Sequence, residues 1–369
     1  MRDVFVVSDN IFSPLGKTTA ENFVQLESGE SGIRLHENVF SPQPYYAALF
    51  TDQISGDTQY TKFEQLLIAS IAEALANSAI DPKDKRTLLI VSTTKGNISL
   101  LETTDYNDKL RKRISLPASG EIVARYFGFI NQPLVISNAC ISGIMAIIAG
   151  KRLIQSGQYD HVVVAGADVI TKFVLSGFQA FQAVSSQPCR PFDAARDGIT
   201  LGEGAATVIL SSRPSPNAVK VSGGAVSNDA NHLSAPSRTG EELAQAINAT
   251  LKDAGADQIG FISAHGTATL YNDEMEAKAV NLSGLQNVPL NSLKGQYGHT
   301  LGAAGLIESI VSIQSMREGI LIPTLGYHQQ GTSNALNIYK ENLQGNYKNC
   351  LKIASGFGGC NAAVLFTRE

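Results

Sequence analysis

Three residues of this chain have types and contexts that suit nucleophilic acyl chemistry: Cys140, His265 and His299. The segment LVISNACISGIMAIIAG predicts a buried strand, a sharp turn at Cys140 and then an apolar helix. The free N–H groups and the positive dipole end at a helix start favour a thiolate, so Cys140 is a candidate nucleophile. The alternative is a small buried core cysteine, which is common in proteins.

The two histidines lie in glycine-containing loops. His265 follows a predicted strand in FISAHGTATLYND, and His299 precedes a small-residue helix in KGQYGHTLGAAGLIE. Glycine beside a histidine indicates that the backbone approaches a ligand closely. A lone histidine is more often a satisfied polar group than a catalyst, but two such loops and a cysteine at a helix start favour an active site.

Short β-branched strands alternate with amphipathic helices and must position these residues. The expected strands are residues 4–7, 87–92, 134–137, 161–165, 206–210, 219–226, 260–263, 351–354 and 362–366. The expected helices are residues 60–78, 141–156, 239–254, 272–280 and 303–317. This alternation predicts an α/β protein in which helices cover the sheets.

A Pro- and Ser-rich segment, residues 211–217, is the best linker candidate. It predicts an N-terminal half, residues 1–212, that carries the cysteine, and a C-terminal half, residues 213–369, that carries the two histidines. No sequence repeat is visible between the halves, so a duplication is only a structural suspicion.

Composition excludes several classes of protein. The chain has 369 residues, 43% of them hydrophobic, which is enough to form a sizeable core. Its net charge of −4 argues against the basic surface that nucleic-acid binding requires. We expect no membrane span, because apolar runs of about 18 residues are absent, and no signal peptide, because the N-terminus predicts a strand. The four scattered cysteines form no C-x-x-C pair, so we expect no metal site and a reduced, cytoplasmic protein.

These motifs resemble those of the β-ketoacyl-[acyl-carrier-protein] synthases of the I/II (Cys-His-His) type, within the thiolase superfamily. The segments CRPFDAARDGITLGEGAATVIL and SGFGGCNAAVLF extend the resemblance over nearly the whole chain. It implies a thiolase-like α/β fold, in which two related halves form five α-β-α-β-α layers. It also implies a homodimer, or alternatively a heterodimer, that works with an acyl carrier protein and has no cofactor beyond that carrier's phosphopantetheine.

The resemblance further implies a decarboxylative condensation. Cys140 would carry the acyl group, and the N–H groups of Cys140 and Phe357 would form an oxyanion hole. His265 and His299 would stabilise the enolate that forms when a malonyl thioester loses CO₂. Phe357, between two glycines, would act as a gate.

Supporting roles follow from the same resemblance. Lys294, with Glu308 and Asp273, would order the histidines and charges, and Thr267 and Thr269 would contact the phosphopantetheine arm. The two acids have a plainer interpretation as ordinary helix residues. Asp193, Arg196 and Asp197 favour a structural ion-pair cluster over a catalytic role.

Several alternatives and departures stay open. The run KLRKR at residues 109–113 is a candidate docking site for an acidic carrier, although such runs are usually solvated helix faces. The stretch between residues 94 and 135 looks short for the family, and the nucleophile motif is SNACISG rather than the commoner D-T-A-C. Rival functions are a subunit of a ketosynthase heterodimer and a non-decarboxylative thiolase. The glycine-framed His299 argues against the initiating, Cys-His-Asn type of synthase.

Overall fold

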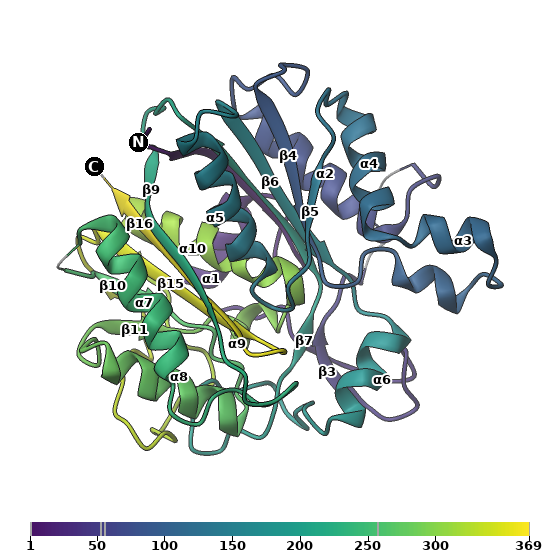
Figure 1. Cartoon of the computed structure of the whole chain (residues 1–369). Coiled ribbons are helices and arrows are strands. Elements are labelled where there is room, and N and C mark those ends of the chain that lie inside the picture. Colours follow the sequence, from purple (N-terminus) through teal and green to yellow (C-terminus); the bar gives the residue numbers. More distant parts are fainter. Residues whose placement is uncertain (1, 52–53, 55–56, 257, 369) are drawn as a thin grey trace.

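The computed structural model describes residues 2–51, 54, 57–256 and 258–368 of the chain. Its main feature is an eleven-stranded sheet that consists of two five-stranded halves and one short edge strand (Figure 1). The first half has the order β5-β4-β6-β8-β1 and the second the order β11-β10-β15-β16-β9. The first-half strands are β1 (Phe5–Phe12), β4 (Thr87–Ser92), β5 (Leu134–Ile136), β6 (His161–Asp168) and β8 (Gly204–Ser211). The second-half strands are β9 (Val219–Asn228), β10 (Phe261–Ser263), β11 (Pro289–Asn291), β15 (Asn349–Gly356) and β16 (Cys360–Arg368).

The two halves repeat one topology. Numbered along the chain within each half, both have the strand order 3-2-4-5-1. The pairings also match, because strands 3-2 and 2-4 are parallel and strands 4-5 and 5-1 are antiparallel in both. Two residue pairs join the halves, Phe5 with Lys220 and Val6 with Val219. The suspected structural duplication is therefore present.

The longer helices form three layers around the two half-sheets. Helices α2 (Lys62–Ala76) and α4 (Leu116–Phe127) cover the outer face of the first half. Helices α7 (Glu241–Ala254) and α8 (Leu270–Leu282) cover that of the second. Between the half-sheets lie α5 (Ser142–Gln155) and α10 (Ala304–Glu318), which contact each other and strands of both halves. The result is the expected arrangement of five α-β-α-β-α layers.

The remaining elements are short. The helices are α1 (Thr19–Glu27), α3 (Asp108–Arg113), α6 (Lys172–Ala180), α9 (Lys294–Tyr297) and two 3₁₀ turns, Ile98–Glu102 and Leu301–Ala303. The strands are β2 (Arg34–His36), β3 (Tyr45–Ala48), β7 (Leu201–Gly202), β12 (Ile320–Leu321), β13 (Asn337–Ile338) and β14 (Leu343–Gln344). No helix in the described part of the chain is long and apolar enough to cross a membrane.

Local sequence explains the elements that carry the site. In β4, all six residues of TLLIVS are buried, as expected of a strand covered on both faces. Helix α5 is buried along most of its length because it lies between the half-sheets. Helices α5 and α10 approach closely at Gly143, where a Cβ atom would lie 2.8 Å from the backbone nitrogen of Leu306. The two central helices are therefore in close contact.

The expected elements all occur, and each expected helix ends within two residues of its observed bounds. Strand β11 and helices α4 and α6 were not predicted from residue patterns. The three residues of β11 are too few to show a period, and α6 contains Gly177, which weakens a helical pattern. The boundary expected between residues 212 and 213 falls in the turn between β8 and β9 and stays a prediction.

Candidate active site

Cys140 lies in a sharp turn between β5 and α5, two residues before the helix begins. Ala139 has a positive φ of 43°, which L-residues rarely adopt, so the turn is strained. The Ser142 hydroxyl holds this turn, because it accepts from the N–H of Asn138 (2.8 Å) and donates to the carbonyl of Ala139 (2.6 Å). The strand–turn–helix geometry presents the sulfur to a cavity, as in other nucleophile elbows.

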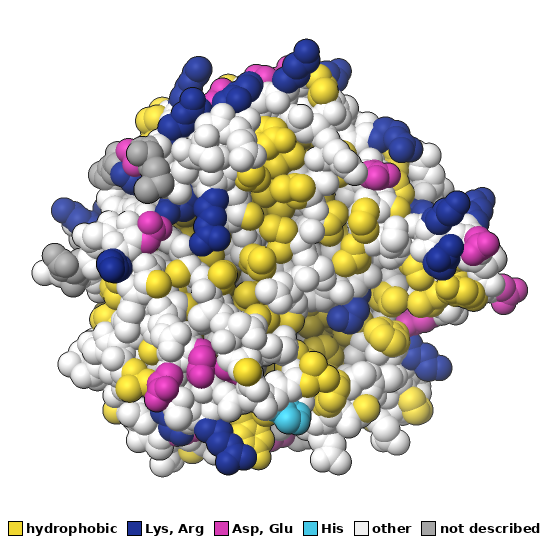
Figure 2. Space-filling model, in the orientation of Figure 1, with side chains coloured by type: hydrophobic (Ala, Val, Ile, Leu, Met, Phe, Trp, Pro, Cys, Tyr) yellow, Lys and Arg dark blue, Asp and Glu magenta, His cyan; other side chains and the backbone are white. Residues whose placement is uncertain are grey.

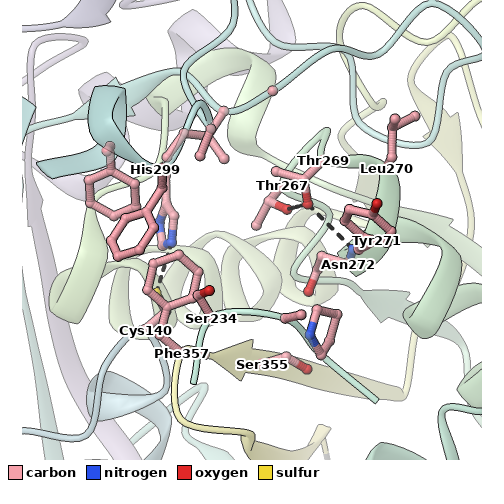
Figure 3. Close-up of a pocket in the computed structure, with 18 of the residues that line it drawn as sticks. Cys140, Ser234, Thr267, Thr269, Leu270, Tyr271, Asn272, His299, Ser355 and Phe357 are labelled. Atoms are coloured by element: carbon pink, nitrogen blue, oxygen red, sulfur yellow. Dashed lines mark hydrogen bonds between the residues drawn. The ribbon is translucent and has the colours of Figure 1, made fainter. Parts of the chain in front are cut away.

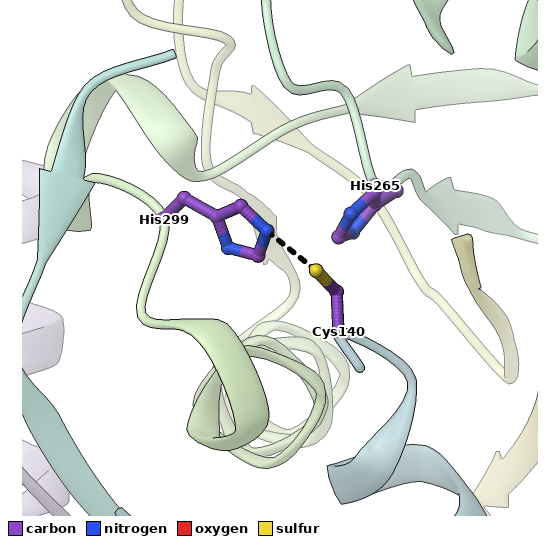
Figure 4. Close-up of side chains that lie close together, drawn as sticks. All are labelled: Cys140, His265 and His299. Carbon is purple, nitrogen blue, oxygen red and sulfur yellow. Dashed lines mark hydrogen bonds between the residues drawn. The ribbon is translucent and has the colours of Figure 1, made fainter. Parts of the chain in front are cut away.

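The structure brings the two histidines to Cys140 (Figure 4). His299 Nε2 lies 3.0 Å from Cys140 Sγ, and the ring of His265 meets that of His299 edge-on at 5.1 Å between centroids. The N–H of Leu301 donates to His299 Nδ1 at 3.2 Å. Because Nδ1 accepts, Nε2 carries the hydrogen of the neutral ring and points it at the sulfur.

The other half of the molecule fixes the His299 loop. The His299 N–H donates to the carbonyl of Thr200 (2.6 Å), and the N–H of Gly202 donates to the His299 carbonyl (3.0 Å). Three residues further on, the N–H of Gly302 donates to the buried carboxylate of Asp168 at the end of β6 (2.7 Å). The first half therefore supplies the nucleophile and also holds one of the histidines in place.

Lys294 lies behind His265 and is paired with Glu308. The Lys294 ammonium donates to the His265 carbonyl (3.0 Å) and lies 3.5 Å from His265 Nδ1. It also forms a buried ion pair with Glu308. A cation beside Nδ1 favours the tautomer in which Nε2 carries the hydrogen and Nδ1 accepts. Burial and the Lys294 ammonium hold the pKa of His265 well below its usual value, so its ring is neutral.

Two buried acids of α8 hold the backbone that follows His265. Glu276 accepts from the N–H of His265 (2.7 Å) and of Gly266 (2.6 Å), and Asp273 accepts from the N–H of Thr267 (2.9 Å). Burial raises the pKa of Asp273 to about 6 and, together with the charge of Asp273, that of Glu276 to about 7. Sequence reasoning found Asp273 but missed Glu276, although a separation of three places both acids on one helix face.

The expected ion-pair cluster at residues 193–197 is wrong in its pairing. Asp193 accepts backbone N–H groups, including that of Gln329 (2.8 Å), and Asp197 accepts from Ser185 and Ser186. Arg196 faces Asp273 instead, 3.9 Å from its carboxylate. Sequence neighbours do not pair here because the loop turns Arg196 toward α8.

The expected resting thiolate is not supported. Cys140 is 9% exposed, and this burial raises the pKa of its thiol to about 12, with Cys360 adding to the rise and Lys294 opposing it. The loss of solvation outweighs the helix start, whose partial charge is small. The resting nucleophile is therefore a thiol.

A cavity of about 330 Å³ leads to Cys140 and both histidines (Figure 3). Phe357, 39% exposed, lies in its wall against Phe178 and Phe181 at centroid separations of 5.9 and 5.8 Å. Gly356 brings this turn close to the nucleophile, since a Cβ atom there would lie 3.0 Å from Cys140 N. Phe357 therefore lies in the cavity wall beside the turn that carries Cys140, and its role as a gate stays a prediction.

Thr267 and Thr269 also line the cavity, and their hydroxyl oxygens lie 2.9 Å apart. Thr269 has a structural task as well, because its side chain accepts from Asn272 N and caps α8. Thr269 is therefore tied to the start of α8 as well as to the cavity.

Cys140, His265 and His299 offer three potential metal ligands within 4.8 Å of one another. The charges around them oppose a cation, because the Lys294 ammonium lies 3.5 Å from His265 Nδ1. Lys352 Nζ lies behind the same loop, 2.9 Å from the carbonyl of Ala264. The arrangement suits a developing anion better than a metal ion.

The fold and this site define a condensing enzyme with a thiolase-like architecture. The chain matches the models described as "Beta-ketoacyl synthase, N-terminal domain" over residues 1–215 and "Beta-ketoacyl synthase, C-terminal domain" over residues 218–328. The chain therefore belongs to the β-ketoacyl synthase family and is an acyltransferase.

Curated relatives and solved structures agree. The chain is 28% identical to 3-oxoacyl-[acyl-carrier-protein] synthase 2 of Vibrio cholerae and 30% identical to the enzyme of that name from Rhizobium meliloti, with 100% of this chain and 99% of each relative covered. A ketosynthase (ApeO) from Xenorhabdus doucetiae, solved in complex with its chain length factor (ApeC), superimposes with a TM-score of 0.88 at 25% identity. That match covers 100% of this chain and 98% of the other.

Proposed function

We propose that this enzyme catalyses a decarboxylative Claisen condensation between an acyl group held on Cys140 and a malonyl group held on an acyl carrier protein. In the first half-reaction, the sulfur attacks an acyl thioester, and the carrier's phosphopantetheine thiol leaves with the proton of Cys140. In the second, the malonyl thioester loses CO₂, and the resulting carbanion attacks the acyl carbonyl. The C–S bond to Cys140 breaks, and the sulfur takes up a proton from solvent as the β-ketoacyl product leaves.

The observation that carries this proposal is the convergence of two neutral histidines on one sulfur. His299 Nε2 lies 3.0 Å from Sγ, and the N–H bonds of both rings are directed by the groups that face Nδ1. Two fixed N–H donors suit the oxygen of a malonyl thioester, on which negative charge develops as CO₂ leaves. The same His299 N–H stabilises the sulfur as its proton departs in the acylation step.

The oxyanion hole and gate remain part of the proposal. The N–H groups of Cys140 and Phe357 would receive the oxygen of the tetrahedral intermediate. Support comes from Gly356, whose lack of a side chain lets these two backbone segments approach. Movement of the Phe357 ring away from Phe178 and Phe181 would widen the approach to the sulfur.

Partners follow from the relatives and from exposed surfaces. The enzyme would take both substrates from an acyl carrier protein and need no cofactor except the phosphopantetheine of that carrier, for which Thr267 and Thr269 are the proposed contacts.

Strand β5 is a sheet edge with Leu134 43% exposed, and hydrophobic side chains gather over the region of β5 and α5 (Figure 2). Such an edge is suited to a homodimer or to pairing with a second subunit, as in the ApeO–ApeC complex. The four free cysteines favour a cytoplasmic location.

The basic run at residues 109–113 carries less weight as a docking site. It forms α3, and Arg113 is engaged in a two-point ion pair with the buried Glu64 (2.5 and 2.6 Å). Lys109 and Lys112 remain for a partner, beside a surface cavity of about 880 Å³.

The rival functions fit the site less well. A partner subunit without catalysis would have no need of a complete Cys-His-His arrangement. A thiolase would need a second reactive cysteine, but Cys140 is the only cysteine among the described residues that line the cavity. Cys360 directs its sulfur toward the carbonyl of Phe357, 3.4 Å away.

The test is a mass spectrum of the carrier protein after incubation of the enzyme with an acyl-carrier donor and malonyl-carrier protein. The expected product is a β-ketoacyl group two carbons longer than the donor, with release of CO₂. No elongation across several donors, while a control synthase is active, would contradict the proposal and favour the heterodimer subunit. Elongation that appears only after a candidate second subunit is added would identify the chain as a heterodimer subunit.

A further inference from the structure

Lys352 is a second lysine at the site, and neither the motifs nor the proposed roles account for it. It lies in β15 and is fully buried, at 0% exposure. A buried lysine is costly unless its charge is paired, so its partners must explain it.

Lys352 makes one buried ion pair and two hydrogen bonds to the backbone. Its Nζ lies 2.7 Å from Glu308 Oε2 and donates to the carbonyls of Ser263 (3.1 Å) and Ala264 (2.9 Å). Two carbonyl acceptors and the charge of a buried carboxylate suit an ammonium group better than a neutral amine, which has no charge to pair with Glu308. Burial lowers the pKa of Lys352 and Glu308 opposes this effect, in keeping with a charge held by its ion pair.

Lys294 and Lys352 act on one segment from the same side. Together they hold three consecutive carbonyls, since Lys294 donates to that of His265 and Lys352 to those of Ser263 and Ala264. Glu308 bridges both ammonium groups. This cluster, which we call the two-lysine cluster, consists of Lys294, Lys352 and Glu308 and carries one net positive charge.

Other charged groups near His265 come from different elements. Glu276 of α8 accepts the N–H of His265 on its backbone, and His299 faces the ring edge-on. Lys352 is among the charges that hold the pKa of His265 down, after burial, Lys294 and His299. The two-lysine cluster is the net cation directly behind the ring.

We propose that Lys352 is a positioning residue of the condensation reaction: with Lys294 it holds the backbone of residues 263–265 and supplies the excess positive charge that keeps His265 neutral with its Nε2–H toward the substrate. The reason is the match between two ammonium groups, one bridging carboxylate and three successive carbonyls. This inference rests on the proposed role of His265 in decarboxylation. It assigns to β15 a task that sequence motifs around the histidines do not show.

The test compares variants that change the net charge of the two-lysine cluster. Lys352→Met keeps the side-chain length and reduces the net charge from one to zero, while Glu308 stays paired with Lys294. The double variant Lys352→Met/Glu308→Gln restores one positive charge. Ile353→Val is the matched control, because Ile353 is the next buried residue of β15 and packs in a different core on the opposite face.

The first measurement is the titration of the His265 ring by NMR in the free enzyme, which has six histidines in all. Lys352→Met is expected to raise the pKa of His265 by about 0.5 unit or more, because a nearby like charge is removed. The double variant should return toward the native value, and Ile353→Val should not differ from it. An unchanged titration in folded Lys352→Met would overturn the proposal.

The second measurement is CO₂ release from malonyl-carrier protein as a function of pH. The acid limb of the rate should move to higher pH in Lys352→Met. At neutral pH the rate should fall by a factor of up to about 10, because the ring is held less firmly. If Lys352→Met does not fold, the double variant is compared with the single variant Glu308→Gln. The pKa of His265 must then be higher in the double variant than in Glu308→Gln, or the proposal fails. A native enzyme that releases no CO₂ would count against the proposed function, while the titration alone decides the role of Lys352.

Discussion

At the residue scale, the site combines a thiol that resists ionisation with two histidines that resist protonation. Burial raises the pKa of Cys140 to about 12 and lowers that of His265 and His299. All three groups are therefore neutral before substrate arrives. Charge appears only during reaction, where fixed N–H donors and the helix start can stabilise it most.

Replacement of the nucleophile should separate the two half-reactions. In Cys140→Ala, condensation should be abolished because no acyl-enzyme can form, while malonyl decarboxylation should persist because both histidines remain. Intact-protein mass spectrometry after incubation with an acyl donor checks the first point. Acylation of this variant at another residue would disprove the assignment of Cys140.

Removal of one donor should affect CO₂ release. His299→Ala deletes the N–H that points at the sulfur and, in our proposal, at the malonyl oxygen, so decarboxylation should fall by about 10²- to 10³-fold. The measurement is the rate of CO₂ release in single-turnover conditions, with folding checked by circular dichroism. An unimpaired rate would refute the proposed role of His299.

At the element scale, strands and loops bring distant segments to one point. Motifs around Cys140, His265 and His299 predicted which loops meet, because each follows a recognisable strand or precedes a small-residue helix. The roles of Glu276 and Lys352 were not predicted. A glutamate in a polar helix and a lysine in an apolar strand show no functional pattern in the sequence, and only their burial in the structure indicates a role. The Asp168 contact to the His299 loop also joins residues 134 positions apart, which no local pattern contains.

The contact between the two central helices gives an element-scale prediction. Gly143→Ala would place a Cβ atom 2.8 Å from Leu306 N, so α5 and α10 must separate, with an expected loss of stability of about 1–3 kcal/mol. Chemical denaturation followed by circular dichroism measures it. Gly177→Ala in α6 is the matched control, because nothing lies within 4 Å of a Cβ atom there, and it should be neutral or slightly stabilising. Equal stability of the two variants would show that the helices tolerate separation.

At the scale of the whole molecule, the largest core and the site both lie between the halves. The core cluster includes Ile144 of α5 and Val208 of β8 from the first half and Leu306 of α10 and Phe366 of β16 from the second. The nucleophile comes from the first half, whereas both histidines come from the second. The duplicated topology therefore builds one functional unit.

This shared core predicts the behaviour of the separated halves. Residues 1–212 and 213–369 expressed alone should fail to unfold cooperatively, because each would expose its side of the central helix layer. Co-expression should give a complex that recovers part of the acylation activity. Cooperative thermal unfolding of either half alone would show instead that the halves are independent domains.

The burial of Cys140 has a consequence for its oxidation by peroxides. Peroxides oxidise thiolates to sulfenic acid, and they react slowly with protonated, inaccessible thiols. Cys140 is 9% exposed at the end of a cavity, beside the ring of Phe357, and its pKa of about 12 leaves almost no thiolate near neutral pH. The resting enzyme is therefore expected to keep its nucleophile reduced during oxidative stress.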